Sequence, residues 1–302
     1  MSNNSIEFLT NAIKGWSIEI TPPVANKITD FSKIMKLGTK VNVTHLPGTT
    51  PIETIETSKK LYVQGMLPVP HLAVRSIQNL ETLETLVKQL VEKAKIKEIL
   101  IIGGSVNKPV GDLHESMQVL NSGLLEKYGI NKVGVAGHPE GSPDISNMQL
   151  ELALVRKNEW AQKQGIDVYI ETQFAFDPKP VLEWEKNIRK NGNKLPIHIG
   201  IPGPATIKTL LKFAISSGIG PSLQMLKKQS KNISKLFSMQ SPDRYIYGLA
   251  RGMEDDKACL IKHLHFYPFG GFLKTVEWVS AIEKGMVKLD DFEGFEVILS
   301  KL

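Results

Sequence analysis

Short runs of apolar and β-branched residues recur along most of this chain and predict buried β-strands. A run such as Ile99-Leu100-Ile101-Ile102 is apolar at every position, which is typical of a parallel strand covered on both faces. Eight runs are expected to be strands: Trp16–Ile20, Lys40–Thr44, Pro68–Val74, Lys97–Gly103, Lys132–Gly137, Asp167–Gln173, Pro196–Ile201 and Ile261–Tyr267.

The segments between these strands carry apolar residues three and four positions apart, which predicts amphipathic helices. In residues 78–94 the apolar positions are Leu80, Leu83, Leu86, Val87, Leu90 and Val91. In residues 145–164 they are Met148, Leu152, Val155 and Trp160. Further helices are expected over residues 205–216, 221–238 and 275–284.

Alternation of strands and helices predicts a parallel α/β sheet, and eight such units favour a closed (β/α)8 TIM barrel. We expect a single domain over residues 1–302, with its core at about residues 16–285, because no linker or low-complexity tract divides the chain. An open doubly wound sheet is the alternative. That fold usually has a glycine fingerprint after its first strand, where this chain has Thr21-Pro22-Pro23.

Charge and cysteine content narrow the class of protein. The net charge of +6 is spread along the chain, so it predicts no nucleic-acid partner and suits an anionic small molecule. One cysteine, Cys259, excludes an intramolecular disulfide and a cysteine metal cluster. The N-terminus lacks a signal-peptide pattern, and no run approaches about 18 apolar residues. We therefore expect a soluble cytoplasmic protein with no membrane partner.

Polar residues stand at the ends of the predicted strands, where barrel enzymes place their chemistry. Glu19 lies inside the first strand, and an acid there is costly to bury unless it is paired or used. An edge strand with Glu19 facing water is the alternative. A purely structural role is the alternative for several of these residues. Hydrogen-bonded interior groups would account for His45, His71 and Gln173, and a tight turn would account for Gly103-Gly104.

His263 and His265 lie two positions apart and so share one strand face, which leaves a metal-dependent hydrolase as an alternative. A metal site needs three or four converging ligands, and no carboxylate pattern accompanies the other histidines, so no metal is predicted. The chain also lacks a Gly-x-Ser-x-Gly elbow and a phosphate-loop lysine motif.

Taken in order, the strand ends resemble the methylenetetrahydrofolate reductase family. The resemblance runs from Ser17 to about Phe272. It rests on Ser-Ile-Glu-Ile-Thr-Pro-Pro (17–23), Val-Thr-His (43–45), Pro-His-Leu (70–72), Gly-Val-Ala-Gly-His-Pro-Glu (134–140), Thr-Gln-Phe-Ala-Phe-Asp (172–177), Gly-Ile-Pro-Gly-Pro (200–204) and His-Phe-Tyr (265–267).

This resemblance implies a (β/α)8 barrel that carries FAD, uses NADH or NADPH as reductant and interconverts 5,10-methylene- and 5-methyltetrahydrofolate. It implies Glu19 as the general acid at folate N10, and Ser105, Gln173 and Phe174 as folate-binding residues. The cofactor-binding positions it implies are Thr44, His45, His71, Ile102, Gly103, Gly104, Ala136, His138, Ser142, Glu151, Arg156 and Lys157.

The chain departs from the family mainly on the cofactor side. Gly103-Gly104-Ser105 replaces Arg-Gly-Asp, His138 replaces a tyrosine and Ser142 a histidine, Glu151 replaces an aspartate, and Gly271 replaces an arginine. Three functions therefore stay open: an FAD-dependent reductase, a flavin-independent folate oxidoreductase, and a non-catalytic folate-binding barrel. The choice of NADH or NADPH, the physiological direction and any homo-oligomer are not determined by the sequence.

Overall fold

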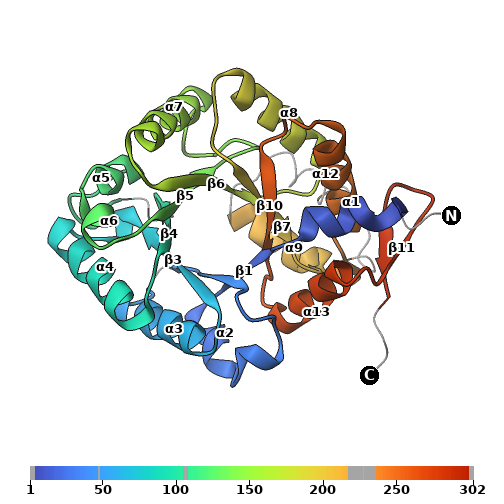
Figure 1. Cartoon of the computed structure of the whole chain (residues 1–302), viewed down its shortest axis with the longest axis horizontal. Coiled ribbons are helices and arrows are strands. Elements are labelled where there is room, and N and C mark those ends of the chain that lie inside the picture. The colour runs from blue at the N-terminus through green and yellow to red at the C-terminus, as the bar shows by residue number, and fades with distance from the viewer. Residues whose placement is uncertain are drawn as a thin grey trace. The chain divides into compact units, whose positions relative to one another are not determined.

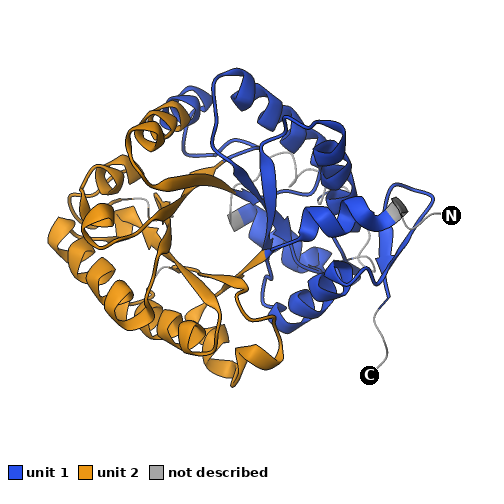
Figure 2. Ribbon diagram, in the orientation of Figure 1, with its two compact units in different colours: residues 1–16, 138–153, 172–302 blue, residues 17–137, 154–171 orange. Residues whose placement is uncertain are grey.

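The computed structural model of the chain describes residues 4–46, 48–104, 106, 108–216, 227 and 236–298. The chain divides into two compact units (Figure 2). Unit 2 consists of Ser17–Gly137 and Leu154–Glu171. Unit 1 consists of Met1–Trp16, His138–Ala153 and Thr172–Leu302. The expectation of a single domain stays a prediction.

The main sheet is a closed barrel with the strand order β1-β10-β7-β6-β5-β4-β3-β2 (Figure 1). Its strands are β1 (Ser17–Ile20), β2 (Lys40–Val43), β3 (Leu67–Ala73), β4 (Glu98–Ile102), β5 (Lys132–Gly137), β6 (Asp167–Phe174), β7 (Ile197–Pro202) and β10 (Ile261–Tyr267). Each strand begins and ends within one residue of its predicted bounds. The predicted (β/α)8 barrel is therefore confirmed.

Unit 2 surrounds its strands with helices (Figure 1). These are α2 (Pro22–Lys27), α3 (Pro51–Val63), α4 (Leu80–Ala94), α5 (Ser116–Leu120) and α6 (Leu124–Lys127), with 3-10 turns η1 (Phe31–Lys33) and η2 (Val74–Ser76). Helix α4 buries Leu83, Val87 and Leu90, as its apolar spacing predicts. Helix α3 was not predicted, although Thr50 and Glu53 form a capping box before its first turn.

Unit 1 contains α1 (Asn4–Ile13), α8 (Pro178–Lys190), α9 (Ile207–Ser216), α12 (Asp243–Asp255) and α13 (Phe272–Glu283). Two small antiparallel sheets pair β8 (Ala205–Thr206) with β9 (Met239–Gln240) and β11 (Val287–Leu289) with β12 (Phe295–Val297). The expected helix over residues 221–238 lies almost wholly outside the described residues. No helix in the described ranges has the length and apolar character needed to cross a membrane.

Helix α7 (Asn147–Lys163) lies where a helix was predicted, but it buries a different face. Met148 is 79% exposed, and Leu152 and Val155 are also exposed, whereas Lys157 and Trp160 are buried. The helix was predicted from four apolar positions, and three of these four residues are exposed. Apolar spacing identifies a stripe on a helix, but the neighbouring elements decide which face is covered.

Strand register determines which side chains of unit 2 lie on the same face of the sheet as Glu19. Glu19 on β1 is the register partner of Asn42 on β2, and His71 on β3 is the partner of Leu100 on β4. Leu100 is in turn the partner of Gly134 on β5. Register partners in a parallel sheet project on the same face, so these side chains share the face that carries Glu19.

Gly134 makes room for a buried ring on this face. A Cβ atom at this position would lie 2.6 Å from Leu100 Cδ1 and 2.7 Å from Tyr169 Cζ and Oη. Tyr169 is among the largest fully buried side chains of the protein. The absence of a side chain at residue 134 is therefore a packing requirement of the strands.

We expect Gly134→Ala to lower the free energy of unfolding by about 1–3 kcal/mol, because the added methyl overpacks the space held by Leu100 and Tyr169. Urea denaturation of the full chain measures the change. Gly165→Ala is the matched control, since a Cβ there would meet nothing within 4 Å. Equal destabilisation by the two substitutions would contradict this account of the packing.

Candidate active site

Three consecutive strands bring polar groups together at Glu19, whose side chain is 13% exposed. The Thr44 hydroxyl, just after β2, donates a hydrogen bond of 3.0 Å to Glu19 Oε2. His71 Nε2, on β3, lies 3.6 Å from Glu19 Oε1. The alternative of an edge strand with Glu19 facing water is therefore wrong, because β1 belongs to a closed barrel and the Glu19 carboxyl lies among side chains.

The surroundings of Glu19 favour its protonated form. Burial raises the pKa of the Glu19 carboxyl above its usual value of 4.5, because a carboxylate loses hydration there. His71 and the Thr44 hydroxyl act in the opposite direction on that pKa and only partly offset the burial. A carboxyl that keeps its proton at higher pH than usual is suited to donate it.

A second acid, Glu171 on β6, was not among the predicted site residues. It is 4% exposed, and Asn42 Nδ2 donates a hydrogen bond of 2.7 Å to its Oε1. One carboxyl oxygen of Glu171 lies within 4.8 Å of one of Glu19. The signal that singled out Glu19, an acid inside an apolar strand, is also present at Tyr169-Ile170-Glu171.

Burial raises the pKa of Glu171 well above 4.5, and the charges of Glu19 and Glu98 add to the effect. Lys40 and the Asn42 amide lower that pKa and offset only part of the rise. Lys40 itself pairs with Glu98, with a distance of 2.7 Å between its Nζ and Glu98 Oε2. A second carboxyl group with a raised pKa therefore lies beside Glu19.

The predicted cofactor positions after β4 lie beside an arginine that sequence reasoning missed. Gly103 and Gly104 follow β4, and their carbonyl oxygens accept hydrogen bonds from the guanidinium of Arg75. The predicted Ser105 lies outside the described residues. In the sequence, Arg75 is marked only by being a basic residue directly after a predicted apolar strand.

Of the predicted cofactor residues on α7, the structure buries one and exposes two. Lys157 Nζ lies 3.4 Å from the carbonyl oxygen of Ala136 at the end of β5. Burial lowers the pKa of Lys157 to about 8, and Glu115 opposes that shift. Glu151 and Arg156 are exposed, so neither shares the buried environment of Lys157.

The other predicted positions are half-buried. Ile102 is the last residue of β4, and His45 follows Thr44. Burial lowers the pKa of His45. In unit 1, His138 is half-buried and the Ser142 hydroxyl accepts a hydrogen bond of 3.4 Å from the Asp144 amide.

The predicted folate residues of unit 1 stand at the end of β6. Gln173 is half-buried, and its side chain makes no hydrogen bond to another residue in the described ranges. Phe174 is buried among aromatic rings, with centroid distances of 4.7 Å to Phe269 and 5.6 Å to Tyr267. Tyr267 also donates a hydrogen bond of 2.9 Å to the carbonyl of Thr172, which fixes this strand end.

The two histidines on β10 have different surroundings. His265 is fully buried, and burial lowers its pKa to about 3, so its imidazole is neutral. The ring of His263 instead packs against His198, with 4.4 Å between ring centroids.

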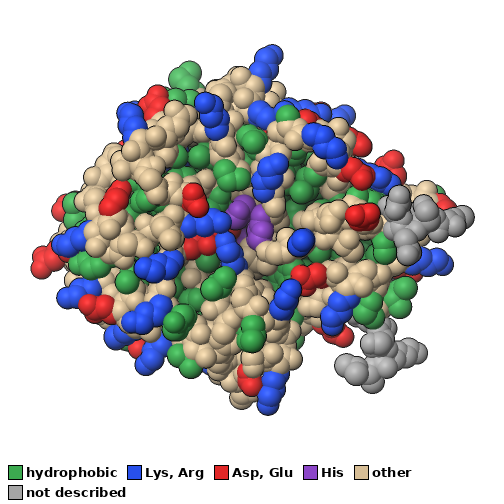
Figure 3. Space-filling model, in the orientation of Figure 1, with side chains coloured by type: hydrophobic (Ala, Val, Ile, Leu, Met, Phe, Trp, Pro, Cys, Tyr) green, Lys and Arg blue, Asp and Glu red, His purple; other side chains and the backbone are tan. Residues whose placement is uncertain are grey.

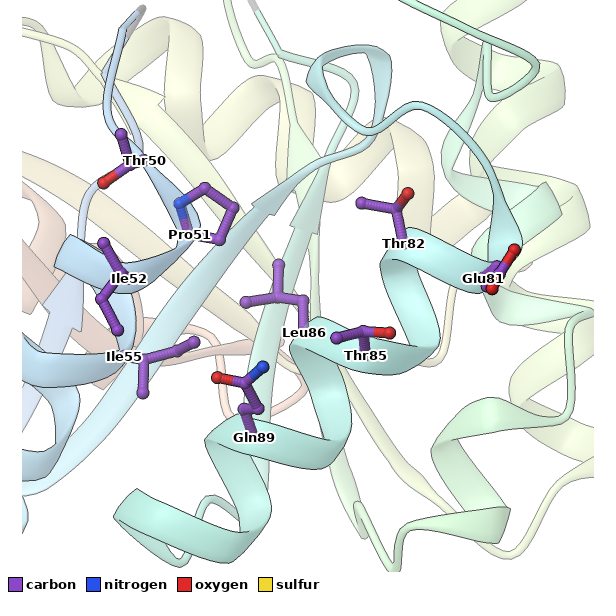
Figure 4. Close-up of a pocket in the computed structure, with 9 residues that line it drawn as sticks. All are labelled: Thr50, Pro51, Ile52, Ile55, Glu81, Thr82, Thr85, Leu86 and Gln89. Atoms are coloured by element: carbon purple, nitrogen blue, oxygen red, sulfur yellow. The ribbon is translucent and has the colours of Figure 1, made fainter.

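A groove of about 550 Å³ lies between α3 and α4 (Figure 4). Its lining includes Ile52, Ile55, Thr82, Thr85, Leu86 and Gln89. None of the predicted site residues lines this groove, so it is distinct from the strand ends described above. On the face seen in Figure 3, Lys and Arg side chains are scattered among Asp and Glu side chains.

No protein-family model matches this sequence. A protein from Clostridium thermocellum that binds two copies of 5-methyl-5,6,7,8-tetrahydrofolic acid has a similar structure, with a TM-score of 0.57 and 13% identity. The alignment covers 93% of this chain and 99% of that chain.

Two further solved structures are less similar. The deoxyribose phosphate aldolase from Aeropyrum pernix has 13% identity and a TM-score of 0.46, covering 92% of this chain and 94% of that chain. Yersinia pestis DHPS with a pterine-sulfa conjugate has 11% identity and a TM-score of 0.47, covering 92% and 95%. At these identities the Clostridium thermocellum protein shows a likeness of fold alone, and it agrees with the barrel topology of this chain.

Proposed function

We propose that this protein is a folate oxidoreductase that interconverts 5,10-methylene- and 5-methyltetrahydrofolate, with Glu19 as the general acid. The observation that carries the proposal is the buried Glu19 carboxyl at a strand end, held by Thr44 and His71. The resemblance of the strand ends to methylenetetrahydrofolate reductases supports the reaction. The Clostridium thermocellum protein, which binds a methylated tetrahydrofolate, supports a folate ligand.

The reduction consumes one proton and one hydride. Transfer of the Glu19 proton to N10 breaks the bond between N10 and the bridging carbon, and that carbon remains on N5 as an iminium. Addition of a hydride to the carbon then produces the N5-methyl group. Glu19 is left as a carboxylate, which burial disfavours, so it takes a proton back from water before the next turnover.

The neighbours of Glu19 have separate tasks in this proposal. Thr44 holds one carboxyl oxygen through a hydrogen bond, so the other oxygen is the one presented for proton transfer. The raised pKa of Glu171 disfavours a second negative charge beside Glu19. Gln173 is proposed to bind the pterin edge, because an amide both donates and accepts hydrogen bonds. Phe174, packed among rings, is proposed to shape that side of the site.

The proposed cofactors are FAD and either NADH or NADPH; when bound, a reduced flavin or the nicotinamide itself supplies the hydride. The described residues of unit 2 fit a phosphate-bearing cofactor. Gly103 and Gly104 present backbone without side chains, and Arg75 places a positive charge beside them. Lys157 adds a second, buried amine near the end of β5.

A non-catalytic folate-binding barrel is the second candidate, and the folate ligand of the Clostridium thermocellum protein favours it as much as it favours an enzyme. The two candidates differ in whether the Glu19 proton is needed, so a substitution at Glu19 separates them.

Glu19→Gln removes the proton donor and keeps the size of the side chain. We expect folate-dependent oxidation of NADH or NADPH to fall by about 10²–10⁴-fold, which is the usual contribution of a general acid. Steady-state rates measure the change, and the thermal unfolding temperature checks the fold. Glu56→Gln, at an exposed position of α3, is the control and should keep full activity. Full folate-dependent turnover in Glu19→Gln would contradict the assignment.

The rate should also fall as the pH rises through the raised pKa of Glu19, because the acid then loses its proton. The Thr44 hydroxyl stabilises the carboxylate and lowers that pKa, so Thr44→Val should move the alkaline limb of the rate profile to higher pH. The profile of kcat against pH, recorded for both proteins, measures the shift. A shift to lower pH would show that Thr44 does not act on the ionised carboxyl.

Glu171 should make stability fall with rising pH. Because its pKa is raised in the folded state, its stabilising contribution is complete below 4.5 and is lost as the pH rises through the folded pKa. Glu171→Gln removes this titration and keeps an oxygen for the Asn42 amide. We expect the variant to gain stability over the wild type as the pH goes from 4.5 to 8, measured by urea denaturation. A constant difference would contradict the raised pKa of Glu171.

A further inference from the structure

Arg75 follows the end of β3, within η2, and its backbone is fixed on two sides. Its amide donates to the carbonyl of Gly103 at 3.0 Å, and its own carbonyl accepts from the Val110 amide at 3.0 Å. The segment around Val110 is held close by Gly111, where a Cβ would lie 1.8 Å from the carbonyl oxygen of Gln78. The side chain of Arg75 therefore starts from a rigid position at the ends of β3 and β4.

The guanidinium of Arg75 is held as firmly as its backbone. Nε donates a hydrogen bond of 3.3 Å to the Gly103 carbonyl, and Nη2 donates to the Gly104 carbonyl. Nη1 has no hydrogen-bond partner among the described residues, and no carboxylate in the described ranges forms an ion pair with Arg75. Carbonyl oxygens are neutral, so the positive charge is oriented without being compensated.

The glycines after β4 keep this charge accessible. Gly104 has φ +88°, and a Cβ there would lie 3.1 Å from Ala73 Cβ, so the backbone passes close to the end of β3. A Cβ at Gly103 would lie 3.9 Å from both Nε and Nη2 of Arg75. A side chain at residue 103 would therefore begin in van der Waals contact with the guanidinium, and glycine places no side chain there.

We propose that Arg75 binds a phosphate group of a dinucleotide at the end of β4. Guanidinium groups pair with phosphate oxygens through two parallel hydrogen bonds, and barrel ligands bind at these strand ends. The proposal rests on the proposed function, in which this strand end receives a cofactor. FAD and NADH or NADPH share the phosphate chemistry, so the experiment below treats each as a separate source.

The test is direct titration of the purified full chain with FAD, NADH, NADPH and riboflavin, followed by ligand or protein fluorescence. In Arg75→Gln we expect the Kd of at least one dinucleotide to rise about 10–100-fold, because a charged hydrogen bond is lost. Riboflavin carries the flavin ring without phosphate, so its binding should not change. Arg75→Lys keeps the positive charge but lacks the paired N–H donors of the guanidinium, so it should weaken binding by a smaller factor.

Lys93→Gln is the matched control, since it removes one positive charge from the last turn of α4, away from β4's end. Thermal unfolding of each variant checks the fold. The proposal is overturned if every dinucleotide binds Arg75→Gln within twofold of the wild type, if riboflavin is weakened equally, or if the wild type binds none of them. Binding that depends on Arg75 in a protein without folate turnover would overturn the proposed function alone.

Discussion

Two carboxyl groups lie largely out of water among the parallel strands of unit 2, and the candidate site depends on how each is accommodated. Glu19 receives one hydrogen bond from Thr44 and lies beside His71. Glu171 receives one from Asn42. Each acid thus has a polar neighbour, yet burial still dominates and raises both pKa values. A protonated acid costs less free energy to bury than a carboxylate and is able to donate a proton. The burial of these carboxyl groups therefore affects both stability and the proposed chemistry.

The strands that carry these acids are otherwise apolar and closely packed. Gly134 leaves space for the Tyr169 ring, and Lys40 and Glu98 neutralise one another in a separate ion pair. Polar groups on this face are therefore few and individually paired. The ionisation of Glu19 therefore depends on nearby side chains, because burial reduces the screening of their effects by solvent.

The proposed cofactor side of the site is organised by backbone more than by side chains. Gly103 and Gly104 place their carbonyl groups on the guanidinium of Arg75, which comes from the preceding strand. An acid and a base expected at these positions are absent from the sequence, and the charge near β4 comes from Arg75 instead. The glycines after β4 thus lack charged side chains, and the guanidinium of Arg75, just after β3, places a positive charge beside them.

Local patterns in the sequence predicted the eight strands and helix α4 and marked Glu19 as a candidate site residue, because apolar spacing and an acid within an apolar run depend on neighbouring residues alone. Tertiary structure decided the buried face of α7, the pairing of Asn42 with Glu171, and the reach of Arg75 to Gly103. These features join residues far apart in the chain. Strand register and the close approach of loops create these contacts, and the spacing of residues within one segment predicts neither of them.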